Sequence, residues 1–383
     1  MTSLGVYIQV PFCQTKCTYC NFHTGVVSQD RYWPYAEAVC REIAEQPLSR
    51  AIVDTVYFGG GTPSLLDPAA LAKILGALRH SYKTDFSEVT LEADPETITS
   101  SKSTAWLSAG FNRINLGSQS FNDQELRTAG RMHRRADIFQ AARILREAGF
   151  RNISMDLIAG LPHQTRETWR KSLDELLAIR PEHVSIYMLE IDEGSRLGRE
   201  SLAGGERYSA ASIPSDDEIA DCYEIAREKL SAAEYGHYEI SNWALPGIES
   251  KHNLKYWRRE PYIGLGAGAH SFDGTQRWAN NHDAARYVSC IEQGISPREQ
   301  VETVTTEQAF DEEFFLGLRQ LQGIDLARIG REYGGDLRAR VATLQSRVET
   351  MCTQGLMEIQ GERVRLAPGK LSISNEVLVE LLG

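Results

Sequence analysis

The sequence predicts an α/β fold, a partial (β/α)6 barrel followed by a small helical, winged-helix-like module. Short apolar strands alternate with amphipathic helical stretches over more than half of the 383 residues, a pattern that is typical of β-α units and a parallel sheet. Six such units can be counted, which is too few for the eight of a closed barrel. From about residue 301 the pattern changes to helices followed by a hairpin.

The six strands are predicted where short apolar runs are bounded by turn residues. They are expected at residues 5–10, 55–58, 88–93, 113–117, 153–158 and 183–189. Helices are expected between them, for example at 69–79, 136–147 and 167–179, where apolar residues recur three or four positions apart. Gly149 follows the second of these helices and Pro181 follows the third, as is typical of helix ends.

The remainder of the chain is expected to cover the sheet. Residues 194–215 are rich in Gly, Ser and Arg and predict a loop, and residues 238–243 predict a strand and a turn. Further on, helices are expected at 307–321, 326–333 and 338–353, and a hairpin at 356–366. Winged-helix modules often bind DNA, but residues 301–383 hold nine basic and 13 acidic residues. This balance favours a packing or partner-binding cap, and we expect two domains, 1–300 and 301–383.

Overall charge and cysteine usage restrict the function. The chain has 41 Lys and Arg against 52 Asp and Glu, a net charge of −11, which argues against binding to nucleic acid or anionic lipid. No signal-like segment opens the sequence and no run of about 18 apolar residues occurs, so we expect a cytoplasmic protein without a membrane span. Four of the seven cysteines stand alone and do not suggest a disulfide framework: Cys40, Cys222, Cys290 and Cys352.

The other three cysteines, Cys13, Cys17 and Cys20, follow the first predicted strand with the spacing Cys-x3-Cys-x2-Cys. Three thiolates from one loop can hold three irons of a four-iron cluster and leave the fourth iron without a protein ligand. A structural zinc site and an electron-transfer cluster normally use four protein ligands, so this loop indicates a cluster with an open iron. Three buried cysteines without a metal are the alternative.

Polar or glycine residues follow the next strands at the same end. The run Gly59-Gly60-Gly61-Thr62-Pro63 follows the second strand, Glu92 closes the third, Gln119 follows the fourth and Asp156 lies on the fifth. Because the carboxyl ends of parallel strands meet at one edge, we expect these residues to gather there. An unpaired carboxylate at Glu92 would cost several kcal/mol. An aminoacyl or ribose group would satisfy it, and a salt bridge to a helix Lys or Arg is the alternative.

Together these motifs resemble the radical S-adenosylmethionine superfamily, and they agree with its HemN and HemW branch along the whole first domain. The resemblance implies that the three cysteines hold a [4Fe-4S] cluster and that S-adenosylmethionine chelates the open iron. It also implies that one electron from the cluster can cleave the sulfonium to a 5′-deoxyadenosyl radical. The S-adenosylmethionine contacts that it implies are Tyr7, Gly60, Gly61, Thr62, Glu92, Gln119, Arg131 and Asp156.

Two features make the chain most similar to the HemW family. Phe22 occupies the position where the related oxidase carries a fourth cysteine, and residues 252–257 read His-Asn-Leu-Lys-Tyr-Trp, the HemW motif His-Asn-x-x-Tyr-Trp. The segment 262–270, which ends Gly-Ala-Gly-Ala-His, continues the match. HemW loops usually carry Asp after the third cysteine, whereas this chain has Asn21, so no role is assigned to that position.

The HemW resemblance implies a haem chaperone that binds haem and transfers it to an acceptor protein, with an electron donor for its cluster. The alternative is a radical enzyme that decarboxylates coproporphyrinogen III, and a nucleic-acid modifying radical enzyme is a remote third. We assign no catalytic residue.

His252, beside Tyr256 and Trp257, is the candidate axial ligand of haem, with a structural role as the alternative, and His270 is a weaker candidate. The basic run 131–135 could receive carboxylates, although beyond Arg131 it is expected to be a solvated helix start.

Overall fold

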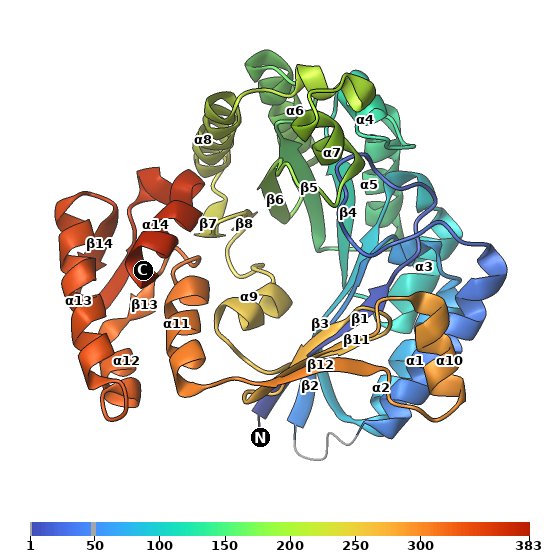
Figure 1. Cartoon of the computed structure of the whole chain (residues 1–383). Helices are drawn as coiled ribbons and strands as arrows, with labels where there is room; N and C mark the ends of the chain where they lie inside the picture. Colours follow the sequence, from blue (N-terminus) through green and yellow to red (C-terminus); the bar gives the residue numbers. More distant parts are fainter. Residues whose placement is uncertain (1, 47–50) are drawn as a thin grey trace.

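The body of the protein is one twelve-stranded sheet with the order β12-β11-β10-β9-β1-β2-β3-β4-β5-β6-β8-β7. A computed structural model describes residues 2–46 and 51–383. Its central strands are parallel neighbours in sequence order: β1 (Thr2–Val10), β2 (Ala51–Gly60), β3 (Lys83–Ala93), β4 (Arg113–Gln119), β5 (Ile153–Ala159) and β6 (His183–Met188). All six predicted strands are therefore confirmed, and the sheet curves into an open barrel (Figure 1).

Helices cover the outer face of this curved sheet (Figure 1). They are α1 (Tyr32–Glu45), α2 (Pro68–Ser81), α3 (Ser100–Ala109), α4 (Asp123–Thr128), α5 (Arg135–Ala148), α6 (Arg166–Ile179) and α8 (Asp216–Ala232). Short 3-10 turns precede three of them: η1 (Gln29–Arg31), η2 (Pro63–Leu65) and η3 (Pro95–Thr97). Gly149 ends α5 with φ 110°, a left-handed conformation that favours glycine, so this predicted helix end is confirmed.

Alternation along the strands separates an apolar outer layer from a polar interior. On β1, Val6, Ile8 and Val10 are fully buried in the main core with the outer helices, while Tyr7 and Gln9 line a cavity on the other face. Successive side chains of a strand point to opposite faces, so the same alternation on each strand gives the barrel a polar lining. This lining is what positions the candidate site.

Short strands extend the sheet at both sides. β7 (Gly236–Glu239) and β8 (Asn242–Ala244) form an antiparallel hairpin beside β6, where the sequence predicted a strand and a turn. On the other side β9 (Tyr262–Leu265) is parallel to β1, and β10 (His270–Phe272), β11 (Gln276–Asn280) and β12 (Arg298–Thr303) follow in antiparallel order. Among the described residues no pairing joins β7 to β12, so the barrel is open as predicted.

The segment 194–215, which the sequence predicted to be a loop, contains two helical elements. α7 (Arg196–Leu202) and the 3-10 segment η4 (Arg207–Ser212) occupy it. The Ser195 hydroxyl accepts a hydrogen bond from the Gly198 amide and caps α7. The prediction was wrong because a short capped helix gives no long apolar period in a segment rich in glycine and arginine.

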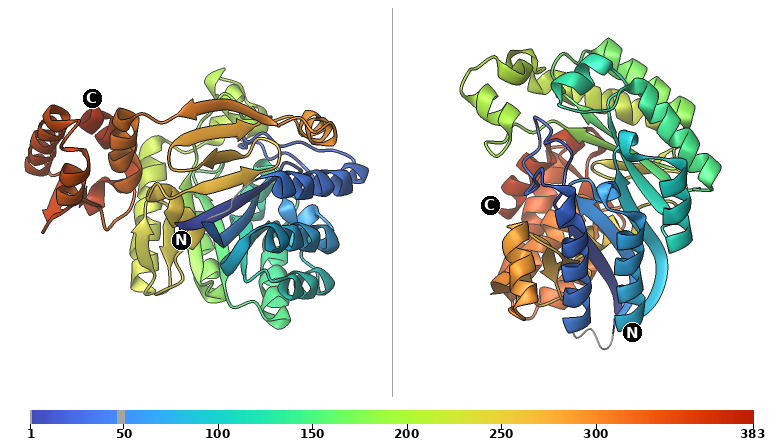
Figure 2. Two further views of the ribbon diagram at one scale, coloured as in Figure 1. Left: turned by 90° about the horizontal axis from the view of Figure 1, so that it is seen from below. Right: turned by 90° about the vertical axis from the view of Figure 1, so that its right-hand side faces the viewer.

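The C-terminal part contains the expected helices and hairpin. Its elements are α11 (Thr306–Gly317), β13 (Ile324–Asp325), α12 (Leu326–Tyr333), α13 (Arg338–Thr353), β14 (Met357–Gln360), β15 (Arg363–Leu366), η5 (Pro368–Ile373) and α14 (Ser374–Leu382). The strands form a separate sheet, β13-β15-β14, and Figure 2 shows this part as a lobe beside the large sheet. The predicted domain boundary between residues 300 and 301 falls inside β12, which belongs to the large sheet. The division into domains 1–300 and 301–383 therefore stays a prediction.

The lobe covers the open side of the barrel. The peptide between α11 and β13 pairs with the edge strand β7: the Ile240 amide donates to the Arg319 carbonyl at 3.0 Å and the Leu321 amide donates to the Tyr238 carbonyl at 3.0 Å. An edge strand without such a partner would invite pairing with another chain. No helix of the described ranges is long and apolar enough to cross a lipid bilayer.

Candidate functional site

The cysteine loop follows β1 and is held from three directions. The Cys13 amide donates to the Gly25 carbonyl at 3.0 Å, the Thr18 amide donates to the Ala129 carbonyl at 3.0 Å, and the Leu197 amide donates to the Thr18 carbonyl at 2.8 Å. All three cysteines are free and half-buried. The loop is therefore fixed by the segment at Gly25 that follows it, by the segment after α4 and by α7, the helix that the sequence analysis missed.

Burial favours the neutral form of two of the thiols in this loop. Burial raises the pKa of Cys13 to about 11 and also raises the pKa of Cys20. A thiolate in such a position needs a cationic partner, which iron supplies. Within residues 2–46 and 51–383 no three His, Cys, Asp or Glu side chains are arranged to hold a single metal ion, and a larger four-iron cluster does not require that arrangement.

The glycine run lets the end of β2 approach the start of the cysteine loop. A Cβ at Gly61 would collide with the Phe12 carbonyl, and a Cβ at Gly60, where φ is 109°, would collide with the Gln9 side chain. The Gly61 amide donates to the Val10 carbonyl at 2.8 Å, and the Thr62 amide donates to the Phe12 carbonyl at 2.7 Å. Gly61 needs glycine because backbone approaches backbone there, and Gly60 needs it because of its positive φ and the close Gln9 side chain.

Glu92 at the end of β3 has polar partners but no cation. Its carboxylate accepts hydrogen bonds from the Tyr57 hydroxyl at 2.8 Å and from the Gly60 amide at 3.1 Å. No Lys or Arg of the described residues pairs with it, so the salt-bridge alternative is wrong. Burial raises the pKa of Glu92 to about 7, and the charge of Asp156 adds to the shift.

Asp156 has a buried oxygen without a partner. The Asn115 amide donates to Oδ2 at 2.8 Å, whereas Oδ1 has no hydrogen bond among the described residues. Burial raises the pKa of Asp156 to about 6. A buried unsatisfied oxygen is costly, so this carboxylate fits a ligand that donates a hydrogen bond.

Arg131 is already engaged beside the cluster loop. It forms an ion pair with Asp94, donates to the Gly117 carbonyl at 2.9 Å and donates to Cys17 Sγ at 3.4 Å. The geometry places it between the cysteine loop and the ends of β3 and β4. Its expected contact with S-adenosylmethionine stays a prediction.

The other members of the basic run 131–135 are not solvated as a group. His133 is fully buried and bonds to the Ser118 carbonyl at 3.0 Å, because the turn before α5 folds inward. The prediction of a solvated helix start was wrong for His133, whereas Arg135 is exposed at the first position of α5 as expected.

Gln119 ends β4 in a left-handed conformation with φ 64°. A non-glycine residue pays about 1–3 kcal/mol for such a backbone, and strained positions of this kind gather at binding sites. Its side chain lies beside Gly117, where a Cβ would come 3.2 Å from the Gln119 amide nitrogen. The proposed contact with S-adenosylmethionine again stays a prediction.

Tyr7 and His252 lie in one aromatic stack in the interior of the barrel. Their rings and that of Tyr57 contact one another, with centroid distances of 6.4 Å between Tyr7 and His252, 6.0 Å between Tyr7 and Tyr57, and 5.4 Å between Tyr57 and His252. His252 is 1% exposed, and both ring nitrogens are occupied, Nδ1 by the Thr55 hydroxyl at 2.9 Å and Nε2 by the Tyr256 hydroxyl at 2.8 Å.

Burial lowers the pKa of His252 to about 3, and the charge of Lys255 adds to this shift. The imidazole is neutral and enclosed. In this conformation neither nitrogen is available to iron, so the geometry does not support His252 as the haem ligand and instead favours the structural alternative.

A cavity of about 550 Å³ opens where these elements meet. Pockets of this size bind cofactors. It is lined by Tyr7, Gln9, Asn21, Phe22, His23, Gly60, Glu92, Tyr256, Tyr262, Gly268, Ala269 and His270. Three of these lining residues, Tyr7, Gly60 and Glu92, were singled out in the sequence as contacts of S-adenosylmethionine.

Sequence reasoning missed four residues that position the site: Gln9, Tyr57, Asp94 and Asn115. Gln9 and Tyr57 follow the two-residue alternation of β1 and β2, which would have placed them on the interior face. Asp94 and Asn115 act through Arg131 and Asp156, and those pairings depend on tertiary structure.

Comparisons with known proteins agree with this geometry. Residues 7–176 match the model of the radical SAM superfamily, and residues 304–368 match the HemN C-terminal domain. The "Heme chaperone HemW" of Bacillus subtilis (strain 168) is 35% identical, with 99% of each chain covered. That of Mycobacterium tuberculosis (strain ATCC 25618 / H37Rv) is 34% identical, with 99% of this chain and 95% of the relative covered.

Among solved structures, coproporphyrinogen III oxidase (HemN) from Escherichia coli, described as a radical SAM enzyme, aligns with a TM-score of 0.85. It is 22% identical, and the alignment covers 99% of this chain and 90% of that chain. This likeness shows the fold.

Proposed function

The chain belongs to the HemW family of radical S-adenosylmethionine proteins, and from that premise we propose that it is a haem chaperone that binds haem and transfers it to an acceptor protein. Membership of this superfamily implies a [4Fe-4S] cluster and S-adenosylmethionine. Relatives that are similar along nearly the whole chain are named haem chaperones. The proposal includes a cytoplasmic location, an electron donor for the cluster and an acceptor for haem.

One observation carries the proposed cofactor site: five successive parallel strands bring the cysteine loop, the glycine run, Glu92, Gln119 and Asp156 to the same end of the barrel. Cys13, Cys17 and Cys20 would hold the cluster. The residues that would hold S-adenosylmethionine are Tyr7, Gly60, Gly61, Thr62, Glu92, Gln119, Arg131 and Asp156. With both groups bound, the site would supply one-electron cleavage of the sulfonium.

The chain's own side chains fit these roles. Glu92 and Asp156 offer carboxylate oxygens inside a buried site, where hydrogen bonds to a ligand's ammonium or hydroxyl groups are strong. Arg131 holds the Cys17 thiol and the end of β4 in one arrangement. Phe22, where the oxidase has a cysteine, supplies no additional thiolate.

The proposal can be tested on full-length protein that is purified without oxygen and reconstituted with iron and sulfide. Haem is titrated while the visible spectrum is recorded, transfer to an apo-cytochrome is followed, and decarboxylation of coproporphyrinogen III is assayed in parallel. We expect stoichiometric haem binding and transfer without decarboxylation. Turnover to protoporphyrinogen would instead establish the oxidase alternative, and no haem binding would overturn the chaperone proposal.

A matched control variant tests whether the cysteine loop holds the iron cluster. Cys17→Ser removes one proposed iron ligand, whereas Cys352→Ser changes a cysteine in α13 of the C-terminal lobe. We expect the first variant to lose iron and the second to keep it. Equal iron content in both variants would contradict the assignment of the loop.

A further inference from the structure

The cavity of about 550 Å³ has two walls of different chemistry. Tyr7, Gly60 and Glu92 form the wall inside the barrel, which the proposed function gives to S-adenosylmethionine. The outer wall is formed by Phe22 and His23 after the cysteine loop and by His270 at the start of β10. The outer wall is not needed for the cluster or for S-adenosylmethionine.

Two exposed imidazoles, of His23 and His270, line this outer wall, and the exposed His282 lies beside His23. The rings of His23 and His282 lie 4.9 Å apart between centroids, and burial lowers the pKa of His270, with a smaller contribution from the nearby His23. Within the described ranges none of the three side chains is hydrogen-bonded, whereas both nitrogens of His252 are. Free imidazoles at a cavity mouth are available to bind a metal centre.

The backbone that carries His270 is fixed by a buried carboxylate. Glu42 on α1 is 2% exposed and accepts hydrogen bonds from the Gly266 amide at 2.9 Å, the Asn280 amide at 2.6 Å and the Tyr287 hydroxyl at 2.6 Å. The neighbouring Ala267 amide donates to the Tyr35 hydroxyl at 2.8 Å. A side chain presented by such a supported loop has a defined position.

Flat apolar surface lies beside His270. Phe22 is 63% exposed, and Tyr256 and Tyr262, which line the same cavity, meet edge to face with centroids 4.6 Å apart. Exposed aromatic surface at a cavity mouth marks a binding site. A mouth that leaves one edge of its ligand in water also suits a cargo that must be released to another protein.

Resting on the proposed function, we propose that His270 is the axial ligand of the haem cargo and that Phe22 packs against the porphyrin at the mouth of the cavity. In this arrangement His252 packs in the interior aromatic stack and does not bind the haem iron. The sequence analysis named His252, in the His-Asn-x-x-Tyr-Trp motif, as the candidate ligand. The structure favours His270 instead, because His270 is exposed and not hydrogen-bonded among the described residues, whereas His252 is buried with both ring nitrogens hydrogen-bonded.

The test compares His270→Ala with His80→Ala, a histidine exposed at the end of α2 on the outer layer. Both variants are made in full-length, cluster-reconstituted protein and titrated with hemin. We expect His270→Ala to weaken binding at least tenfold and to change the visible and electron paramagnetic resonance spectra of the bound haem. His80→Ala should match the wild type.

Chemical rescue distinguishes ligation from a structural effect. In His270→Gly, added imidazole should restore the wild-type spectrum if the lost group is an iron ligand. Unchanged affinity and spectra in His270→Ala, while the wild type binds haem, would overturn this assignment alone. A wild type that binds no haem would instead overturn the proposed function. If His270→Ala loses haem but imidazole restores nothing in His270→Gly, the ligand assignment also fails.

Discussion

At the scale of single residues, the interior of the barrel holds two carboxylates whose charged form burial disfavours, although each accepts hydrogen bonds from its neighbours. Glu92 and Asp156 lie on neighbouring parts of the polar lining, and burial raises the pKa of the first to about 7 and of the second to about 6. A buried carboxylate without a cation is normally avoided. A ligand or a proton that neutralises the charge would stabilise such a site, and residues that break the pattern of an apolar strand end are expected at functional sites.

Glu92→Gln should change how stability depends on pH. Because the pKa of Glu92 is raised from 4.5 to about 7 in the folded protein, the folded state binds its proton more tightly, and the free energy of unfolding falls as pH rises between those values. Glutamine has no titrating carboxyl group, so the free energy of unfolding of the variant should not fall in this way. We expect the cluster-loaded variant without S-adenosylmethionine to gain stability relative to wild type at pH 8 but not at pH 4, by at most about 3 kcal/mol.

Urea unfolding at several pH values between 4 and 8 measures this difference. Glu380→Gln, which changes an exposed residue of α14, is the control and should follow the wild type. A loss of stability in Glu92→Gln that is equal at every pH would show that the carboxylate is not strained by burial.

At the scale of elements, the sequence predicted those whose period was long enough to read. The six central strands and the helices α2, α5 and α6 show clear alternation or amphipathic spacing, and their bounds differed from the prediction by a few residues. β9 and β10 were not predicted as strands because each is short and the peptide between them is rich in glycine. Their register is set by β1 and β11, which local sequence does not reveal.

The helix α9 (Lys251–Trp257) shows how tertiary contacts changed the interpretation of a motif. Glu88 of β3 accepts hydrogen bonds from the Lys251 and His252 amides at 3.1 and 2.9 Å, and so caps this helix from 163 and 164 residues away. Sequence alone indicated an imidazole among aromatic side chains. It did not show that Thr55 and Tyr256 would occupy both nitrogens.

Thr55→Val tests this structural role with a side chain of the same shape. It removes the partner of His252 Nδ1 in a buried position, where an unsatisfied group costs about 1–3 kcal/mol. We expect urea unfolding to show a loss of that size and hemin titration to show an unchanged spectrum. Tyr256→Phe, which removes the partner of Nε2, should lose stability by a similar amount. An altered haem spectrum in Thr55→Val would favour His252 as the ligand.

At the scale of the whole molecule, the location of the site could be predicted because topology fixes it. Parallel strands in sequence order carry their carboxyl ends to one edge, so motifs more than 100 residues apart converge without any knowledge of side-chain contacts. The relation of the C-terminal lobe to the barrel could not be predicted in this way. It depends on surface residues of both parts that have no motif of their own.

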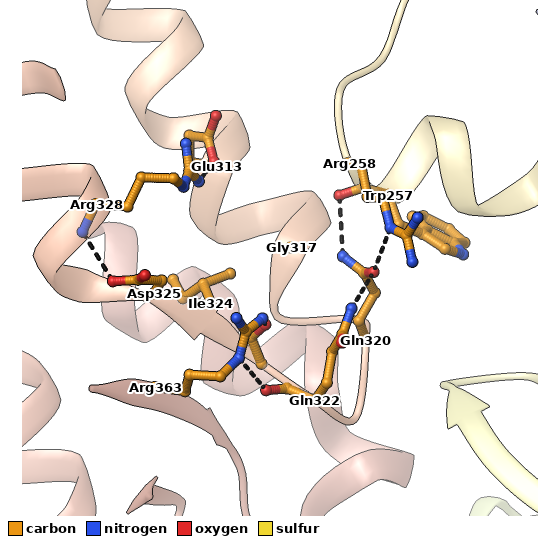
Figure 3. Close-up of a pocket in the computed structure, with 11 residues that line it drawn as sticks. Trp257, Arg258, Glu313, Gly317, Gln320, Gln322, Ile324, Asp325, Arg328 and Arg363 are labelled. Carbon is orange, nitrogen blue, oxygen red and sulfur yellow. Dashed lines mark hydrogen bonds and ion pairs between the residues drawn. The ribbon is translucent and has the colours of Figure 1, made fainter. Parts of the chain in front are cut away.

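Part of the seam between the two parts is polar. A cavity of about 310 Å³ lies there, lined by the end of α9 and by the lobe. Figure 3 shows Gln320 between the Trp257 carbonyl and Arg258, with hydrogen bonds of 3.4 Å to each. Nearby, Arg259 pairs with Glu312 at 2.8 Å, and Arg277 also pairs with Glu312. Polar contacts of this kind allow two parts of a chain to move relative to each other.

Arg259→Met should therefore loosen the lobe without unfolding the barrel. The Arg259 side chain is 11% exposed and its partner Glu312 is 17% exposed, so losing the charged hydrogen bond should cost about 1.5–3 kcal/mol. We expect faster amide hydrogen exchange in α11 and in β7, which the lobe covers, and unchanged exchange in β2 and β4. Arg143→Met breaks an ion pair of 64% and 59% exposed side chains and should stay within about 0.5 kcal/mol of wild type. Exchange that rises equally in all strands would show that barrel and lobe unfold as one unit.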